Sequence, residues 1–187
     1  MTYKGHLAIG YAFSFSPLFI SEVREYVLNN FNPLMIGLSF VLVYFFSLLP
    51  DLDEPNAYLS KKFPWNIISI PLSFFVTHRG ITHTLIFSFV FPTILAGILY
   101  FTGYFYKYWI FVLISWLAYI SHLVGDSLTR SGVKWFYPLN KKSYRLLPKK
   151  LTFKTGSLME GAYIFMFLLL FGYELYLLYS PYFKLPS

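Results

Sequence analysis

Four long apolar runs dominate the pattern of hydrophobic and polar positions along the chain. They cover residues 33–50, 82–106, 108–127 and 157–179. A helix that crosses the hydrocarbon core of a bilayer needs about 20 mostly apolar residues, with a range of roughly 17–25. The four runs meet this requirement, so the pattern predicts an all-α, polytopic membrane bundle.

Two shorter apolar segments complete the predicted bundle. Residues 6–20 contain Pro17 and form either a short span or a helix packed against the others. Residues 64–76 contain Pro64 and Pro71 and are too short to span, so we expect an interfacial or re-entrant segment there. With 6–20 as a span, we expect about five helices in one membrane-embedded domain, residues 1–187.

Composition supports the membrane class. The chain is 57% hydrophobic and 12% charged, whereas a soluble domain carries roughly 25% charged residues. There is no cysteine, which excludes disulfides and thiolate metal sites. We attribute the net charge of +7 to membrane orientation and anionic lipid headgroups, and we expect no nucleic-acid partner.

The basic residues are unevenly shared between the two ends of the predicted spans. Twelve of the 15 lie on the side that holds residues 1–5, 51–81 and the long basic loop 128–156. The opposite side holds 21–32, a tight turn near 107 and the C-terminus. Because cytoplasmic loops carry an excess of Lys and Arg, we expect the basic side, with the N-terminus, in the cytoplasm of a cell or inner membrane.

Every histidine and aspartate lies at or beside a span end on this basic side. If the helices form one bundle, these groups meet at one depth, and ionisable groups at a membrane boundary are candidates for function. A histidine and carboxylate set without cysteine favours zinc, manganese or iron. We therefore predict a divalent-metal site, for one or more ions, with the ligands His6, Asp51, Asp53, His78, His83, His122 and Asp126.

The spacing of the predicted ligands indicates which side chains point in the same direction. His122 and Asp126 are four residues apart, so they project from one helix face. Asp51 and Asp53 are two apart between Pro50 and Pro55, and in an extended segment both carboxylates would point the same way. The set exceeds one tetrahedral shell, which leaves open two ions or one ion with outer carboxylates that orient the imidazoles.

The catalytic candidates are neighbours of these ligands. Asp51 or Asp53 would bind the metal or act as general base. The Arg79 guanidinium would neutralise a phosphate, and the Thr82 and Thr129 hydroxyls would position ligands or substrate oxygens. Glu160 lies in the first turn of the last span. It either takes part in the catalytic site or interacts favourably with the positive end of the helix dipole.

Several of these residues together resemble a known family. The motifs are His6-x-x-x-Gly10, L-L-P-D-L-D (48–53), H-R-G-x-T-H-T (78–84), H-L-x-x-D-x-x-T-x-x-G (122–132) and Y-P-L (137–139). From about residue 4 to about 160 the chain resembles the YdjM-like inner-membrane, metal-dependent hydrolases, which look distantly similar to zinc-dependent phospholipase C. The resemblance implies a multinuclear zinc site with the seven ligands named above, and phosphoester cleavage. Thr84 stands where serine is expected and still supplies a hydroxyl.

Two functions follow from these patterns. The first is a membrane-embedded metal-dependent hydrolase that cleaves a phosphoester of a phospholipid or another amphiphile at the cytoplasmic leaflet. The alternative is a non-enzymatic membrane protein with a structural or transport metal site. The titratable groups gather at one face and do not line a route across the bilayer, which favours the hydrolase over transport.

Overall fold

The protein folds as a bundle of α-helices. The computed structural model describes residues 1–75 and 79–180, and in this part of the chain there are seven α-helices and no β-strand beyond two isolated bridges. The predicted all-α class is confirmed. The helices are α1 (Tyr3–Phe15), α2 (Ser21–Asn30), α3 (Pro33–Leu48), α4 (Trp65–Phe75), α5 (Val90–Phe101), α6 (Phe105–Ser127) and α7 (Leu158–Tyr179).

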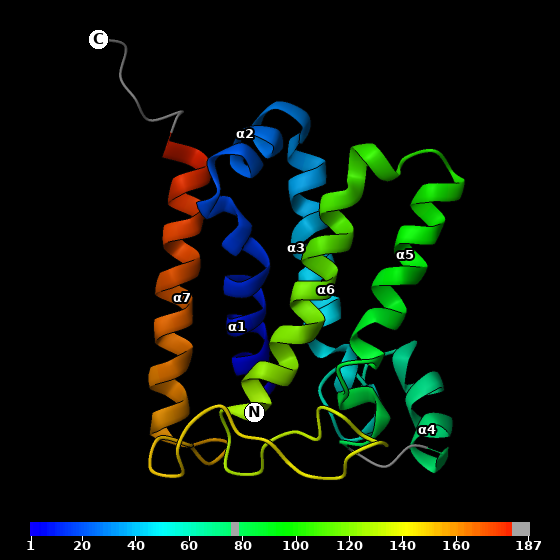
Figure 1. Cartoon of the computed structure of the whole chain (residues 1–187), viewed down its shortest axis with the longest axis vertical. Helices are drawn as coiled ribbons and strands as arrows, with labels where there is room; N and C mark the ends of the chain where they lie inside the picture. The colour runs from blue at the N-terminus through cyan, green and yellow to red at the C-terminus, as the bar shows by residue number, and fades with distance from the viewer. Residues whose placement is uncertain (76–78, 181–187) are drawn as a thin grey trace.

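Five of these helices run along the long axis of the molecule, and two lie at its ends. In Figure 1, α1, α3, α5, α6 and α7 stand side by side, α2 lies across one end, and α4 lies at the other. Three segments are long and apolar enough to cross a membrane, namely Pro33–Asp53, Phe105–Ser127 and Leu158–Tyr179. They confirm three of the four predicted long spans. The outer face of α7 exposes large apolar side chains, including Phe165 and Leu169, as expected of a surface that faces lipid.

The fourth predicted span, 82–106, starts later and ends earlier than its apolar run. The Thr84 hydroxyl donates to the carbonyl of Ile81 at 2.7 Å and accepts from the Phe87 amide at 3.2 Å, which favours a turn over a helix. Helical structure therefore runs only over Phe87–Phe101, too short to count among the three candidate spans. The turn expected near 107 lies at residues 102–104, where Gly103 has φ 78°.

Helix α1 lies inside the bundle. It packs against α3, α6 and α7, and Ile9 and Ala12 are fully buried. Its 13 residues extend for about 20 Å, which is less than the roughly 30 Å of a hydrocarbon core. The 3-10 turn Ser16–Phe19 continues it toward α2, so this segment packs against the other helices and also joins the two ends of the bundle (Figure 1).

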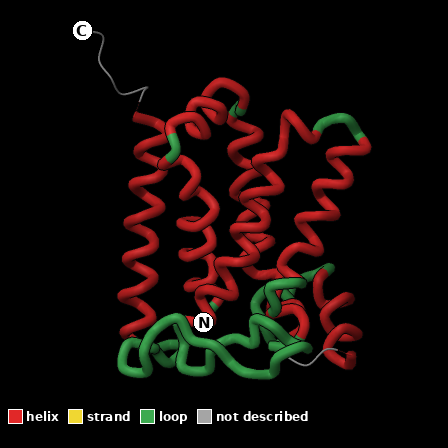
Figure 2. Tube along the Cα trace, viewed as in Figure 1, coloured by secondary structure: helices red, strands yellow, loops and turns green. Residues whose placement is uncertain are grey.

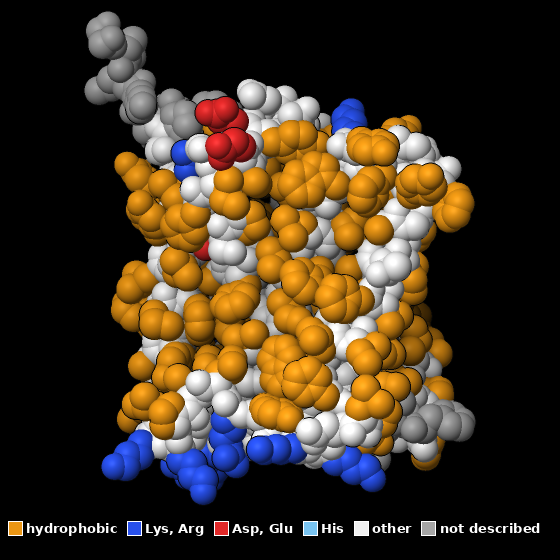
Figure 3. Space-filling model, viewed as in Figure 1, with side chains coloured by type: hydrophobic (Ala, Val, Ile, Leu, Met, Phe, Trp, Pro, Cys, Tyr) orange, Lys and Arg blue, Asp and Glu red, His pale blue; other side chains and the backbone are white. Residues whose placement is uncertain are grey.

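The long loop forms a layer across one end of the bundle. Figure 2 shows that the connection between α6 and α7 covers the same end as the N-terminus. Figure 3 shows Lys and Arg side chains gathered directly below a belt of apolar side chains at this end. Segment 21–32, expected as a plain loop at the opposite end, instead contains α2. Its sequence SEVREYVLNN carries two glutamates and an arginine, which are good helix formers.

We expect Gly10→Ala to lower the stability of the bundle by about 1–3 kcal/mol, because a Cβ there would overlap the side chain of Ser47 on α3. The matched control is Gly37→Ala, since nothing lies within 4 Å of a Cβ at Gly37. Thermal unfolding in detergent measures both. Equal effects of the two substitutions would show that α1 and α3 are not in close contact at Gly10.

Candidate metal centre

Four segments bring histidine and carboxylate side chains together at the end of the bundle that the loop covers. Helix α1 contributes His6, and α6 contributes His122 and Asp126 from its last two turns. The 3-10 turn Leu49–Asp53 follows α3 directly, and a second 3-10 turn, Ile81–His83, precedes α5. These two turns contribute Asp51, Asp53, Thr82 and His83.

Three ligand atoms form a nearly equilateral triangle. His83 Nε2 lies 3.3 Å from Asp51 Oδ1, His122 Nε2 lies 3.4 Å from the same oxygen, and the two Nε2 atoms are 3.3 Å apart. Both imidazoles are fully buried, whereas the Asp51 side chain keeps 21% of its surface exposed. The triangle is therefore closed on the protein side and reachable through Asp51.

Hydrogen bonds engage Nδ1 of both imidazoles, which leaves Nε2 of each ring facing Asp51. His122 Nδ1 lies 2.8 Å from the carbonyl of Ser47, and because a carbonyl only accepts, Nδ1 carries the proton. The Thr82 hydroxyl donates to Asp53 Oδ2 at 2.6 Å, so it accepts from His83 Nδ1 at 3.0 Å. Each Nε2 faces Asp51 Oδ1, and three electron-rich atoms at this spacing require a cation or a proton between them.

The triangle has the dimensions of one face of a tetrahedral zinc site. Zinc binds histidine nitrogen and carboxylate oxygen at about 2.0–2.2 Å, which places neighbouring ligand atoms of a tetrahedron roughly 3.3–3.5 Å apart. The observed edges are 3.3, 3.3 and 3.4 Å. The hydrogen bonds to the far nitrogens are those that usually orient metal-binding imidazoles. The donor set therefore fits a divalent cation.

Asp51 and Asp53 do not point the same way, contrary to the expectation for an extended segment. They lie in a 3-10 turn, where residues two apart are separated by about 240° around the axis. As a result they flank His83: Asp51 approaches Nε2, and Asp53 Oδ2 lies 3.7 Å from Nδ1. Asp53 is buried behind the imidazole and orients it through Thr82.

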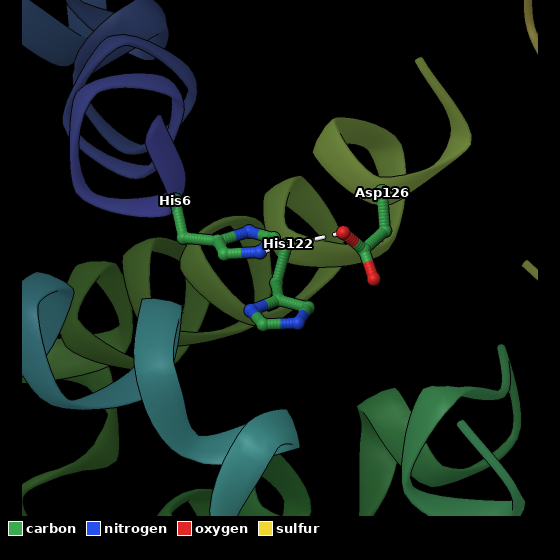
Figure 4. Close-up of side chains that lie close together, drawn as sticks. All are labelled: His6, His122 and Asp126. Carbon is green, nitrogen blue, oxygen red and sulfur yellow. Dashed lines mark ion pairs between the residues drawn. The ribbon is translucent and has the colours of Figure 1, made fainter. Parts of the chain in front are cut away.

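His6, His122 and Asp126 form a second group of possible ligands. Figure 4 shows His6 reaching from α1 toward Asp126 on α6, and His6 Nε2 lies 3.5 Å from Asp126 Oδ1. The rings of His6 and His122 are stacked, with centroids 3.6 Å apart. Because Nδ1 of His122 is occupied by the Ser47 carbonyl, its single free nitrogen belongs to the triangle. The two groups are thus neighbours that share His122.

Asp126 is held by cationic groups and is not part of the triangle. Its Oδ2 accepts from Arg79 Nη2 at 2.9 Å, and its Oδ1 accepts from the α-amino group of Met1. Arg79 also donates to Ser131, whose hydroxyl lies 2.9 Å from that of Thr129. Thr129 in turn donates to the backbone carbonyl of Asp126 at 2.6 Å. Thr129 therefore positions the ion pair between Arg79 and Asp126.

Glu160 lies apart from the possible metal ligands. Its carboxylate accepts from the amide of Thr2 at 2.6 Å, from the Thr2 hydroxyl at 2.9 Å and from the amide of Gly156 at 2.5 Å. These contacts join the first turns of α1 and α7. The structure thus favours the second reading of Glu160, in which it stabilises helix ends.

A cavity of about 250 Å³ adjoins the triangle and brings in residues that the sequence patterns did not single out. One wall carries Tyr3 and Tyr58, whose rings stack with centroids 4.1 Å apart. Two aromatic residues that pair across distant segments leave no spacing signal in a sequence. Glu54, by contrast, directly follows Asp53, so its place in the sequence could have identified it as a residue near the site. The lining residues are Met1, Tyr3, His6, Asp51, Glu54, Asn56, Ala57, Tyr58, Arg79 and Asp126.

Of the predicted ligands, six are brought to this end of the bundle, and His78 lies outside the described residues. Tyr119, which sequence reasoning missed, donates its hydroxyl to the carbonyl of Thr82 at 2.7 Å and so supports the turn that carries His83. Its target is a backbone atom far away in sequence, which no motif encodes.

The fold and the site together define a class of protein: an all-α membrane bundle with a buried cluster of histidine and aspartate at one end. The sequence model of the YdjM inner membrane protein family matches residues 1–184, so the chain belongs to this family. The family resemblance found from the motifs is confirmed. The hydrolase activity that the resemblance implies and the distant similarity to zinc-dependent phospholipase C stay predictions.

Two curated relatives extend the comparison. The chain is 31% identical to the inner membrane protein YdjM of Escherichia coli (strain K12), and equally to that of Shigella flexneri, over 102 residues. Each alignment covers 49% of this chain and 44% of the relative, so it spans less than half of the proteins it matches. No solved structure matches the chain. Family and composition together establish a membrane protein.

We expect Asp51→Asn to lower zinc affinity at least about tenfold, because it removes the one negatively charged atom of the triangle. Glu174→Gln is the matched control, since it neutralises another buried acid on α7, remote in sequence from the site. Stripped protein in detergent is titrated with Zn²⁺ against a chromophoric chelator. Unchanged affinity in Asp51→Asn, or no zinc binding by the unmodified protein, would show that the triangle holds a proton instead of a metal.

Proposed function

We propose that this protein is a membrane-embedded, metal-dependent hydrolase that cleaves a phosphoester of a phospholipid or another amphiphile at the cytoplasmic leaflet. The observation that carries the proposal is the triangle of Asp51 Oδ1, His83 Nε2 and His122 Nε2 beside an open cavity. A metal bound there, most simply zinc with manganese and iron as alternatives, would supply Lewis-acid polarisation of a phosphoryl oxygen and activation of water.

The residues around the triangle suit distinct roles. Asp51 lines the cavity, so it is the carboxylate placed to accept a proton from water, while Asp53 lies behind His83 and orients it through Thr82. Arg79 is 25% exposed and also lines the cavity. Its planar fork is held by Asp126 and Ser131 and can neutralise charge on a phosphate.

The position of the cavity supports an amphiphilic substrate. It is lined by residues at the end of the bundle that holds the N-terminus. Figure 3 shows that the apolar belt gives way at this end to Lys and Arg side chains, as expected at the depth of lipid headgroups. A headgroup ester can reach a site at this depth while its acyl chains stay in the bilayer. This is our reason for favouring a lipid over a fully soluble phosphoester.

We expect Arg79→Lys to lower kcat for a phospholipid ester by roughly 100-fold, because lysine keeps the charge but loses the bidentate fork. Zinc content should not change. Arg24→Lys is the control, since Arg24 donates to the carbonyl of Leu18 near the opposite end. Turnover is measured in mixed micelles of phosphatidylethanolamine or phosphatidylglycerol, with and without chelator. Zinc binding with no ester turnover, together with zinc flux in proteoliposomes, would favour the non-enzymatic alternative.

The proposed orientation can be tested directly, because the chain has no cysteine of its own. We expect Lys141→Cys, in the exposed loop layer, to react with a membrane-impermeant maleimide only after cells are permeabilised. Asn30→Cys, at the exposed end of α2, should react in intact cells. The reverse labelling would place the candidate metal centre outside the cytoplasm.

A further inference from the structure

We propose that the loop layer holds a second binding site, which takes the phosphate group of an anionic lipid headgroup. The site is a cavity of about 300 Å³ lined by Arg130, Arg145, Lys149 and Thr152. None of these residues lines the cavity at the metal centre, and the inference does not depend on the proposed hydrolase activity.

The charge of this cavity is positive and uncompensated by the surrounding sequence. Three of its four lining residues are cationic, and residues 127–159 contain no Asp or Glu. Within the described residues, the guanidinium of Arg130 and the ammonium of Lys149 make no hydrogen bond or ion pair. Cations gathered in this way repel one another, and a bound anion relieves the repulsion.

The cations are held on a fixed frame. Arg145 Nε donates to the carbonyl of Arg130 at 2.7 Å, which joins the two arginines across 15 residues. The Arg130 amide donates to the carbonyl of Phe153 at 3.0 Å. Val133 and Tyr144 exchange two backbone hydrogen bonds of 3.0 and 2.8 Å. Such a frame reduces the entropy that is lost when an anion binds.

Phosphate is the anion that this chemistry and position favour. Arginine forks bind phosphate oxygens bidentately, and a lysine ammonium adds a point charge. The loop layer lies at headgroup depth below the apolar belt (Figure 3). No carboxylate lines the cavity to receive the ammonium of a zwitterionic lipid, so the site favours an anionic headgroup.

The same turn of chain serves both sites. Arg130 lines the phosphate cavity, while its neighbours Thr129 and Ser131 hold Asp126 and Arg79 at the metal centre. A ligand on Arg130 would therefore bind one residue away from the hydrogen bonds that position the Arg79 guanidinium.

The test measures binding of dihexanoyl phosphatidic acid, dihexanoyl phosphatidylcholine and inorganic phosphate to the detergent-purified chain. Chelator is present throughout to keep the candidate metal centre empty. The variant Arg130→Gln/Lys149→Gln removes two cavity charges and spares the Arg145 bond. Its control, Lys141→Gln/Lys142→Gln, removes two charges from the same loop outside the cavity. Thermal unfolding verifies that both variants fold.

We expect the cavity variant to weaken phosphatidic acid binding at least about tenfold and the control to weaken it less than about twofold. Competition by inorganic phosphate would identify free phosphate as a source of the ligand, and failure to compete would identify the lipid headgroup. Equal losses in both variants would overturn the site, because the attraction would then be diffuse. Equal binding of phosphatidylcholine by the unmodified chain would overturn it as well.

Discussion

Three electron-rich atoms, Asp51 Oδ1 and the Nε2 atoms of His83 and His122, face one another at the end of an apolar bundle, and the surrounding structure is arranged around this contact. Burial of such groups without compensation is costly, so each must be hydrogen-bonded or share a cation. The carbonyl of Ser47 forms a hydrogen bond with His122, and Thr82, which donates to Asp53, forms one with His83. These hydrogen bonds form only because the ligand-bearing parts of α1, α6 and the two 3-10 turns lie at the same end of the bundle.

The shapes of the segments follow from this requirement. Helix α3 tightens into a 3-10 turn at Leu49–Asp53, which sends Asp51 and Asp53 to opposite nitrogens of one imidazole. The segment before α5 stays out of the helix, so that Thr82 and His83 can approach α6. Helix α1 is short and central, and Gly10 allows it to approach Ser47 of α3 closely. Each departure from a plain spanning helix thus serves the cluster.

The loop layer adds a second electrostatic constraint. It carries eight basic residues and no acid between Asp126 and Glu160, and its backbone bonds hold it against the end of α6. The cations of this layer suit the anionic lipid that we propose as its ligand, while Arg79 and Asp126 form an ion pair of their own. The basic loop layer and the buried cluster are distinct, although Thr129, Arg130 and Ser131 connect them.

The sequence by itself determined the class of fold, three of the long spans, the segregation of basic residues and the convergence of histidines and aspartates, because each of these follows from hydropathy and from span ends. It also placed the chain in its family, through motifs such as H-L-x-x-D-x-x-T around His122. Tertiary structure decided which groups touch. The Ser47 carbonyl behind His122 and the Tyr119 hydroxyl on Thr82 are contacts across tens of residues, and they depend on helix packing that no local pattern encodes. The separation of Asp51 from Asp53 needed the 3-10 geometry, and the end-stabilising contacts of Glu160 needed α1 and α7 to begin side by side.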